Sequence, residues 1–307
     1  MSKTLVGFLV LTLCLITSLT INKADAGREP DQRTEVILLG TGTPYPDPKA
    51  SGPATAVVSG GQFLLFDAGA GVMRQINAAK LPISGPQALF ITHLHTDHTF
   101  GYAELVLTSW IMRRRVPIKI YGPPGLRKMS EKLLAAYAED IRIRTEGLER
   151  EIPGAYKVDV QEIRPGVAYD VNGVRVTAFP VQHGSWKNAY GYRVDAADRS
   201  IVISGDARPS ESLVSASHGV DVLVHEVYAG ARLATEDRPG GEFWPQYMRE
   251  FHTSDLELGE LAQRINPKLL IMTHIIRMGA SDEELVANIR KGGFSGNVAV
   301  GKDLDRY

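Results

Sequence analysis

The sequence predicts an α/β fold, because short apolar runs typical of buried strands alternate with stretches of helical periodicity. Strand-like runs cluster in each half of the chain, with helices between them. Several of the apolar runs stop directly at a histidine or an aspartate, as expected of a site built at strand ends. The chain has no repeats or low-complexity linkers, so we expect a single domain spanning residues 27–307.

Strands and helices are predicted in the first half from apolar runs and the breaks between them. Gly60-Gly61 separates two of the strands and is a hairpin turn signal, and Gly122-Pro123-Pro124-Gly125 breaks the chain before the second helix. We expect strands at 35–39, 54–59, 62–66, 88–92 and 118–121, and helices at 100–110 and 126–138.

The second half repeats this pattern. Ser254 with Glu257, and Ser281 with Glu284, are capping-box patterns that predict helix starts. We expect strands at 174–181, 189–194, 200–204, 220–227 and 269–274, and helices that run to 265 and 289.

Two segments are predicted to be insertions near the site. Residues 140–153 are highly charged, and residues 228–251 contain the aromatics Phe243, Trp244, Tyr247 and Phe251. Long loops in compact domains often act as lids or binding loops. An alternative for the second segment is that its aromatics only pack the loop onto the domain.

The first 26 residues are predicted to be a signal peptide. Lys3 precedes an apolar run at 5–21, and Ala24-Asp25-Ala26 is a cleavage site. Seventeen residues are at the short limit for a membrane span, so we expect cleavage, a periplasmic or secreted protein, and no stable membrane insertion. Cys14 is the only cysteine and leaves with this segment, so metal ligands must be His, Asp or Glu. Leu13 stands where a lipobox has a small residue, which argues against lipidation.

Charge is nearly balanced, with 34 basic and 35 acidic residues. The only basic cluster is Arg113-Arg114-Arg115, whereas nucleic-acid binding usually needs a basic face. The composition therefore favours a small anionic ester as substrate over a nucleic acid. The sequence leaves the oligomeric state open, and a homodimer is one of the states that it allows.

The run from Thr92 to His98 is the most informative part of the chain. It holds three imidazoles and a carboxylate directly behind an apolar run. Such crowding is costly unless a shared metal ion satisfies these groups, although a histidine-rich polar loop is the simpler alternative. Three further candidates each follow an apolar run, namely His183, Asp206 and His274.

The motif His93-x-His95-x-Asp97-His98 resembles the H-x-H-x-D-H signature of the metallo-β-lactamase superfamily, and the three later residues come in the order of that family. The resemblance covers nearly the whole mature chain and implies a four-layer αββα sandwich. It also implies one metal ion bound by His93, His95 and His183, a second bound by Asp97, His98 and His274, and Asp206 as a bridge. Seven ligands exceed the roughly three protein ligands of one catalytic zinc, so two zinc ions are expected, with manganese or iron as alternatives.

Two later segments resemble the ribonuclease Z branch of this superfamily. His225-Glu226-Val227-Tyr228 resembles a His-Glu-Ala-Thr-like motif, and His252-Thr253-Ser254 resembles a His-Ser-Thr-like motif with Thr and Ser exchanged. The resemblance implies that His252 is a general acid and Glu226 its partner. The alternative is a helix-capping His252 and a buried structural pair at 225–226.

Other residues near these motifs are expected to support the reaction. Asp67 is expected to hold the histidine loop, and Asp97 to orient the metal-bound water or accept its proton. The loop at 40–44 resembles the opening loop of the ribonuclease Z branch, whereas residues 45–53 resemble an exported arylsulfatase-like subgroup.

These features predict a secreted dizinc hydrolase in which a metal-bound hydroxide attacks a sulfate or phosphate ester, with arylsulfatase activity favoured. A ribonuclease Z-like phosphodiesterase or endoribonuclease is the main alternative, and a lactonase or β-lactamase comes next. A metal-binding protein without catalysis is the alternative outside enzymes.

Overall fold

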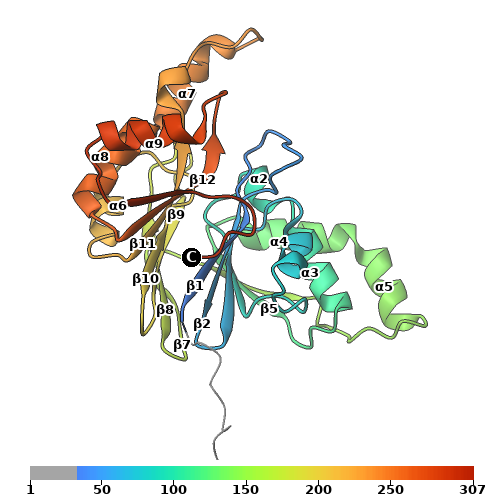
Figure 1. Cartoon of the computed structure of the whole chain (residues 1–307). Coiled ribbons are helices and arrows are strands. Elements are labelled where there is room, and N and C mark those ends of the chain that lie inside the picture. The colour runs from blue at the N-terminus through green and yellow to red at the C-terminus, as the bar shows by residue number, and fades with distance from the viewer. Residues whose placement is uncertain (1–32) are drawn as a thin grey trace, which may run out of the picture. The chain divides into compact units, whose positions relative to one another are not determined.

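The computed structural model describes residues 33–307, so the predicted signal peptide lies outside the described residues. The described strands form two sheets, one ordered β1-β2-β3-β4-β5-β6 and the other β13-β12-β11-β10-β9-β8-β7 (Figure 1). The strands of the first sheet are β1 (Glu35–Gly40), β2 (Ala54–Ser59), β3 (Gln62–Phe66), β4 (Ala88–Phe90), β5 (Ile118–Gly122) and β6 (Val158–Glu162). Those of the second are β7 (Gly166–Val171), β8 (Val174–Pro180), β9 (Tyr190–Asp195), β10 (Ser200–Ile203), β11 (Val222–Tyr228), β12 (Leu269–Ile276) and β13 (Asn297–Val300).

Helices cover the outer face of each sheet. The α-helices of the described chain are α1 (Val72–Ala78), α2 (Thr96–Thr99), α3 (Tyr102–Ile111), α4 (Leu126–Ala136), α5 (Ala138–Glu146), α6 (Glu211–Ala216), α7 (Trp244–Phe251), α8 (Asp255–Ile265) and α9 (Asp282–Lys291). Apolar residues of α1, α3 and α4 pack on the first sheet, and those of α6, α8 and α9 pack on the second. The layers therefore run helix, sheet, sheet, helix, which confirms the predicted αββα sandwich.

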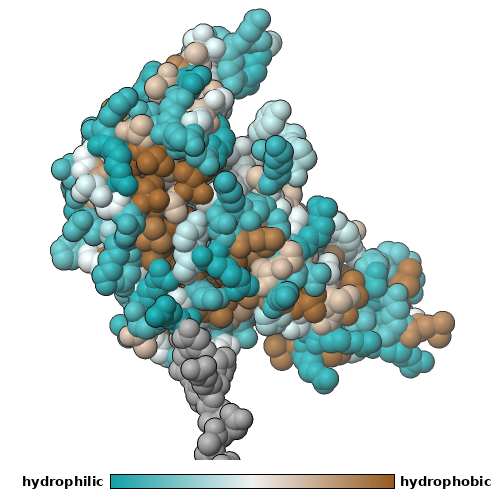
Figure 2. Space-filling view, in the orientation of Figure 1, coloured by the Kyte–Doolittle hydropathy of each residue, from teal (hydrophilic) through white to brown (hydrophobic). Residues whose placement is uncertain are grey.

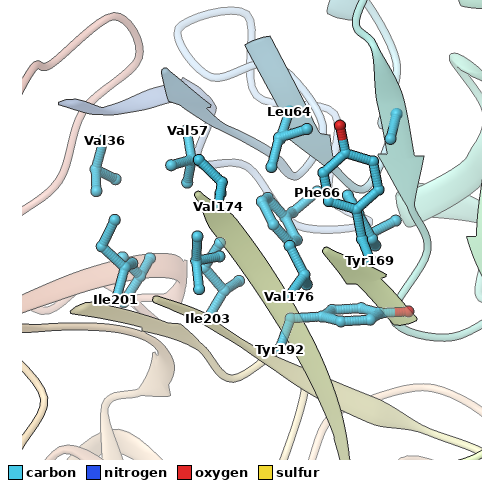
Figure 3. Close-up of a cluster of buried hydrophobic side chains, with 14 of the residues drawn as sticks. Val36, Val57, Leu64, Phe66, Tyr169, Val174, Val176, Tyr192, Ile201 and Ile203 are labelled. Carbon is cyan, nitrogen blue, oxygen red and sulfur yellow. The ribbon is translucent and has the colours of Figure 1, made fainter. Parts of the chain in front are cut away.

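The central core lies between the two sheets (Figure 3). Successive strand residues point to opposite faces, so Val36 and Leu38 enter this core while Ile37 and Leu39 contact the helices outside. Phe90 at the end of β4 is fully buried there. The packing of β4 thus fixes the position at which the histidine loop leaves the sheet.

Most predicted elements are found within two or three residues of their expected bounds. Gly60 and Gly61 have φ angles of 55° and 73°, as a tight hairpin turn between β2 and β3 requires. The predicted capping box of Ser254 and Glu257 opens α8, and the Ser281 side chain accepts a hydrogen bond from Glu284 N at the start of α9.

Both predicted insertions are partly helical, which corrects the loop assignments. The charges at 140–153 include pairs four residues apart, Arg144–Asp140 and Arg142–Glu146, which suit the exposed face of α5. In Figure 1 this helix lies beyond α3 and away from α2. The prediction that it lies beside the site is therefore wrong. The segment 228–251 ends in α7, whose rings Trp244, Tyr247 and Phe251 stack on one another at ring-centroid distances of 5.3 and 4.3 Å.

Helices α1 and α6 and strands β6, β7 and β13 were not predicted from the sequence. These segments are short or mostly polar, so their periodicity is weak. In the described part of the chain, none of the helices has the length and apolar character needed to cross a bilayer.

Candidate metal centre

The histidine loop is held in place by one carboxylate. Asp67, just after β3, accepts hydrogen bonds from Thr92 N, Thr92 Oγ1 and His98 Nδ1, each at 2.8 Å. It adopts a left-handed φ of 59°, a strained conformation of the kind found at functional sites. The expected role of Asp67 in holding this loop is therefore confirmed by its contacts.

Two backbone irregularities bring the later residues to the loop. Gly205 has a φ of 60°, and a Cβ atom there would lie 2.8 Å from Thr92 Cβ, so only glycine lets the end of β10 approach so closely. His274 is the extra residue of a bulge in β12 opposite Glu226 and Val227, with a φ of 44°. Bulges re-aim side chains next to active sites, and this one turns the imidazole toward Asp97.

The first group of candidate ligands consists of His93, His95, His183 and Asp206. His95 Nδ1 lies 2.9 Å from His93 Nε2 and 3.2 Å from His183 Nε2. The opposite nitrogen of each ring has its own partner, which fixes the ring orientation; His93 and His183 donate to an oxygen there, as metal ligands do, whereas His95 accepts from an indole N–H. These partners are Thr92 Oγ1 for His93, the Trp186 indole N–H for His95 at 2.7 Å, and Phe251 O for His183 at 2.7 Å.

The second group consists of Asp97, His98 and His274. Asp97 Oδ2 lies 3.2 Å from His274 Nε2 and 3.6 Å from His98 Nε2. Asp206 stands between the groups, with Oδ1 3.2 Å from His98 Nε2 and Oδ2 3.9 Å from His93 Nε2. The structure thus brings all seven predicted ligands together in the predicted division, and their binding of metal stays a prediction.

The donor atoms fit a pair of cations. Within residues 33–307, His98 Nε2 and Asp206 Oδ1 are buried without a hydrogen-bond partner although they face each other. Burial lowers the pKa of His93 well below its usual range, and it lowers the pKa values of His95 and His183 to about 4. These imidazoles are therefore neutral, as metal binding requires.

The carboxylate between the groups is ionised. Burial alone would raise the pKa of Asp206, but the charges of His274 and His98 hold it well below its usual range. Burial would likewise lower the pKa of His98, but Asp206 and Asp67 raise it. In the absence of metal, positive charge on His98 and His274 balances the carboxylates, and cations would replace those protons. Imidazoles with carboxylates suit zinc, and they also suit manganese or iron.

Comparisons with known proteins place the chain in a family. The profile described as the Beta-lactamase superfamily domain matches residues 63–275. The chain is 35% identical over 277 residues to a ribonuclease Z of Mycobacterium sp. (strain KMS), covering 89% of this chain and 95% of that protein. It belongs to the metallo-β-lactamase superfamily, in the ribonuclease Z-like branch. A ribonuclease Z of Mycobacterium bovis is 33% identical over 280 residues, covering 89% of this chain and 97% of that protein.

Solved structures of this superfamily share the fold. The metallo-β-lactamase fold protein YhfI from Bacillus subtilis has a TM-score of 0.68 at 18% identity, covering 89% of this chain and 98% of that one. The short form of human tRNase Z has a TM-score of 0.64 at 24% identity, with the same coverage. The chain is accordingly a hydrolase of the metallo-β-lactamase fold.

The two remaining predicted catalytic residues lie at the edge of the metal centre. His252 Nδ1 is 3.3 Å from Glu226 Oε1 and 4.0 Å from Asp206 Oδ2, and both side chains are buried. Glu226 Oε1 also accepts hydrogen bonds from Thr253 N and Ala207 N. Burial lowers the pKa of His252 to about 4 and raises that of Glu226 well above its usual range. The structure pairs the two residues, and their part in catalysis stays a prediction.

Sequence reasoning missed part of the environment of the first group. Trp186 follows His183 by three residues in the sequence, and its indole contacts the ring of His95. The segment 228–251 was expected near the site, but its backbone contacts were not: Phe251 O accepts a hydrogen bond from His183 Nδ1, and Glu250 O accepts one from Gly184 N. A backbone carbonyl carries no sequence signal, so only the fold reveals this contact.

Proposed function

We propose that this protein is an exported, dinuclear metal-dependent phosphodiesterase that cleaves single-stranded RNA or oligonucleotides. The observation that carries this proposal is the shared carboxylate Asp206 between two ligand groups, with His252 and Glu226 beside it. The chain's 35% identity to a ribonuclease Z supports the phosphodiesterase alternative over the arylsulfatase that the sequence favoured. Among residues 33–307, no contact at the site favours a sulfate ester over a phosphate ester.

In the proposed reaction, different residues of the chain activate the water, protonate the leaving oxygen and orient the acid. Bound at the two groups, zinc ions would supply a nucleophilic hydroxide at neutral pH and neutralise the charge of the phosphate. Asp97 accepts the proton of the attacking water, because its carboxylate lies within the second group. His252 passes a proton to the leaving oxygen, and Glu226, 3.3 Å from its ring, orients the imidazole and supplies that proton, because burial leaves His252 neutral and Glu226 protonated.

The predicted signal peptide at 1–26 bears on the substrate. Export would separate the enzyme from precursor tRNA, so we propose RNA or oligonucleotides outside the cytoplasm as the substrate class. The near balance of 34 basic and 35 acidic residues also suits a short strand, because a folded RNA needs a wide basic face.

A substrate panel tests this function. The full chain is expressed with its own N-terminus, and the cell fraction and the mass of the recovered protein report export and cleavage. The metal-loaded protein is then offered p-nitrophenyl sulfate, bis(p-nitrophenyl) phosphate, a single-stranded oligoribonucleotide, precursor tRNA and a lactone, each with and without chelator. Chelator-sensitive cleavage of the diester and the oligoribonucleotide is expected. Dominant sulfate hydrolysis would restore the arylsulfatase reading, and silence on every substrate despite bound metal would favour a non-catalytic protein.

Two variants separate binding from catalysis. Asp206→Ala should lose at least one metal ion and all diester hydrolysis. His252→Ala should keep both ions and slow esters with poor leaving groups most, since a good leaving group needs a proton less. His218, exposed in the turn after α6, provides the matched histidine control. Equal slowing of good and poor leaving groups by His252→Ala would remove His252 as the acid.

A further inference from the structure

A cavity of about 800 Å³ opens beside the second group of ligands, and the catalytic assignments do not use it. Asp97 and Thr96 form its inner end, and the loop of residues 43–52 and helix α1 form its walls. Figure 2 shows an indentation between this loop and the part of the chain around α7; the lining residues of the cavity lie on the other side of the loop, toward α1 and α2, and none comes from α7. The cavity is within the size range of small-molecule sites and continues from the reacting centre.

Two exposed aromatic rings line the cavity. Tyr45, in the loop, is 77% exposed, and Phe100, directly after α2, is 68% exposed. Large rings this exposed are unusual beside a buried polar centre, because an exposed ring forgoes the free energy of burial. A ligand that covers the two rings would recover this free energy. Lys49 and Arg74 also line the cavity and are exposed, so cations accompany the rings. Three carboxylates line it too: Asp97 belongs to the second ligand group, Asp303 accepts hydrogen bonds from the loop and α1, and Asp47 accepts one from Lys49 N.

The loop that carries Tyr45 is held firmly at its ends. Asp303, near the C-terminus, accepts hydrogen bonds from Thr41 N at 2.9 Å, from Ser51 N at 2.7 Å and from Gln75 Nε2 at 2.7 Å. Three prolines inside the loop, at 44, 46 and 48, restrict its backbone further. The cavity is therefore built before any ligand arrives, which lowers the entropy lost on binding.

We propose that this cavity binds the nucleoside next to the scissile phosphodiester, with its base in contact with the rings of both Tyr45 and Phe100 and its flanking phosphate near Arg74 and Lys49. Exposed rings combined with cations are the features by which proteins bind single-stranded nucleic acid without reading its sequence. The proposal rests on the proposed phosphodiesterase function and adds where the strand lies. It predicts selectivity for esters that carry a base.

The first experiment compares esters with and without a base. The substrates are the 3′- and 5′-(p-nitrophenyl phosphates) of thymidine and methyl p-nitrophenyl phosphate, and the readout is the ratio of kcat/KM between thymidine and methyl esters. Tyr45→Ala and Phe100→Ala should each lower this ratio roughly tenfold. Tyr45→Phe should preserve it, because stacking needs the ring and not the hydroxyl. Tyr137, which is 44% exposed between α4 and α5, provides the aromatic control, and Tyr137→Ala should leave the ratio unchanged.

The second experiment measures binding without turnover. Fluorescein-labelled pentauridylate with phosphorothioate linkages, which resist hydrolysis, is titrated with the metal-loaded protein, and fluorescence anisotropy gives the Kd. Both alanine variants should weaken binding roughly tenfold, while Tyr137→Ala should not.

The two experiments distinguish failure of the cavity from failure of the function. Hydrolysis of the esters with the same ratio in wild type and both alanine variants would overturn the cavity assignment and leave the phosphodiesterase standing. Ring-dependent binding of pentauridylate without hydrolysis of any ester would retain the nucleotide site and overturn the proposed function. A wild-type protein that does not bind pentauridylate would overturn the cavity assignment directly.

Discussion

Replacing Asp67 by asparagine tests how the second group of ligands is prepared for metal. Asp67 Oδ2 accepts the Nδ1 proton of His98, so Nε2, which faces Asp206, is the nitrogen whose proton a metal ion would replace. An asparagine has one oxygen, so it cannot accept from both Thr92 N and His98 Nδ1 as the carboxylate does. If its amide faces His98, the proton must move to Nε2, where it blocks the metal.

The expected loss is about 10- to 100-fold in affinity at one of two metal sites, the usual effect of removing such a partner, or about 1.4–2.7 kcal/mol. Competition with a chromophoric chelator, together with metal content by mass spectrometry, should show one equivalent bound nearly as tightly as in wild type and a weakened second. Asp198→Asn is the control, since Asp198 accepts a hydrogen bond from Thr34 N at 2.9 Å outside the centre. Wild-type affinity for both equivalents in a folded Asp67→Asn protein would refute the reasoning.

Three further changes probe the first ligand group, the core and a buried histidine. Trp186→Phe keeps an aromatic ring but removes the indole N–H that His95 Nε2 accepts; because this bond keeps the His95 proton on Nδ1, facing the other ligands, the variant should bind metal at least as tightly as wild type in the same competition assay, and the metal-induced change in tryptophan fluorescence should shrink. Phe90→Ala should lower the free energy of unfolding by about 3–5 kcal/mol in urea titrations, because the ring is fully buried and stacked between two others; Phe90→Leu should cost less, and a loss near zero would contradict the packing. Burial lowers the pKa of His225 from 6.5 in the unfolded chain to about 4 in the folded protein. Between pH 6.5 and about 4 the unfolded chain therefore binds more protons than the folded protein. The free energy of unfolding should fall as the pH drops through this range, by up to about 3 kcal/mol. His225→Gln should flatten that part of the pH–stability curve, and parallel curves for variant and wild type would show that His225 does not contribute.

The seven ligands could be predicted because their signals are local and repeated. An imidazole or carboxylate directly after an apolar run marks a strand end, and His183, Asp206 and His274 each follow such a run. The four layers also followed from the resemblance that these residues carry. Composition and periodicity alone predict an α/β domain and not the number or order of its layers.

What could not be predicted depends on contacts between distant segments. The charges of 140–153 suggested a loop, yet ion pairs four residues apart stabilise α5. The bulge that orients His274 arises from the pairing of β12 with β11, so no local sequence pattern predicts it. The cavity beside Asp97 escaped notice because Asp303, far along the chain, shapes the loop that walls it.

The metal centre is built from both sheets, and this links its affinity to the inter-sheet core. His93, His95, Asp97 and His98 follow β4 of the first sheet, whereas His183, Asp206 and His274 follow or interrupt strands of the second. Between them, Tyr192 of the second sheet donates a hydrogen bond to Ile91 O at the base of the histidine loop, at 2.7 Å. Metal binding therefore favours only the state in which the two sheets are packed, and it must stabilise that state by linkage. For the same reason, a core change such as Phe90→Ala should weaken metal binding from outside the ligand groups, in proportion to how far it lets the two halves of the site move apart.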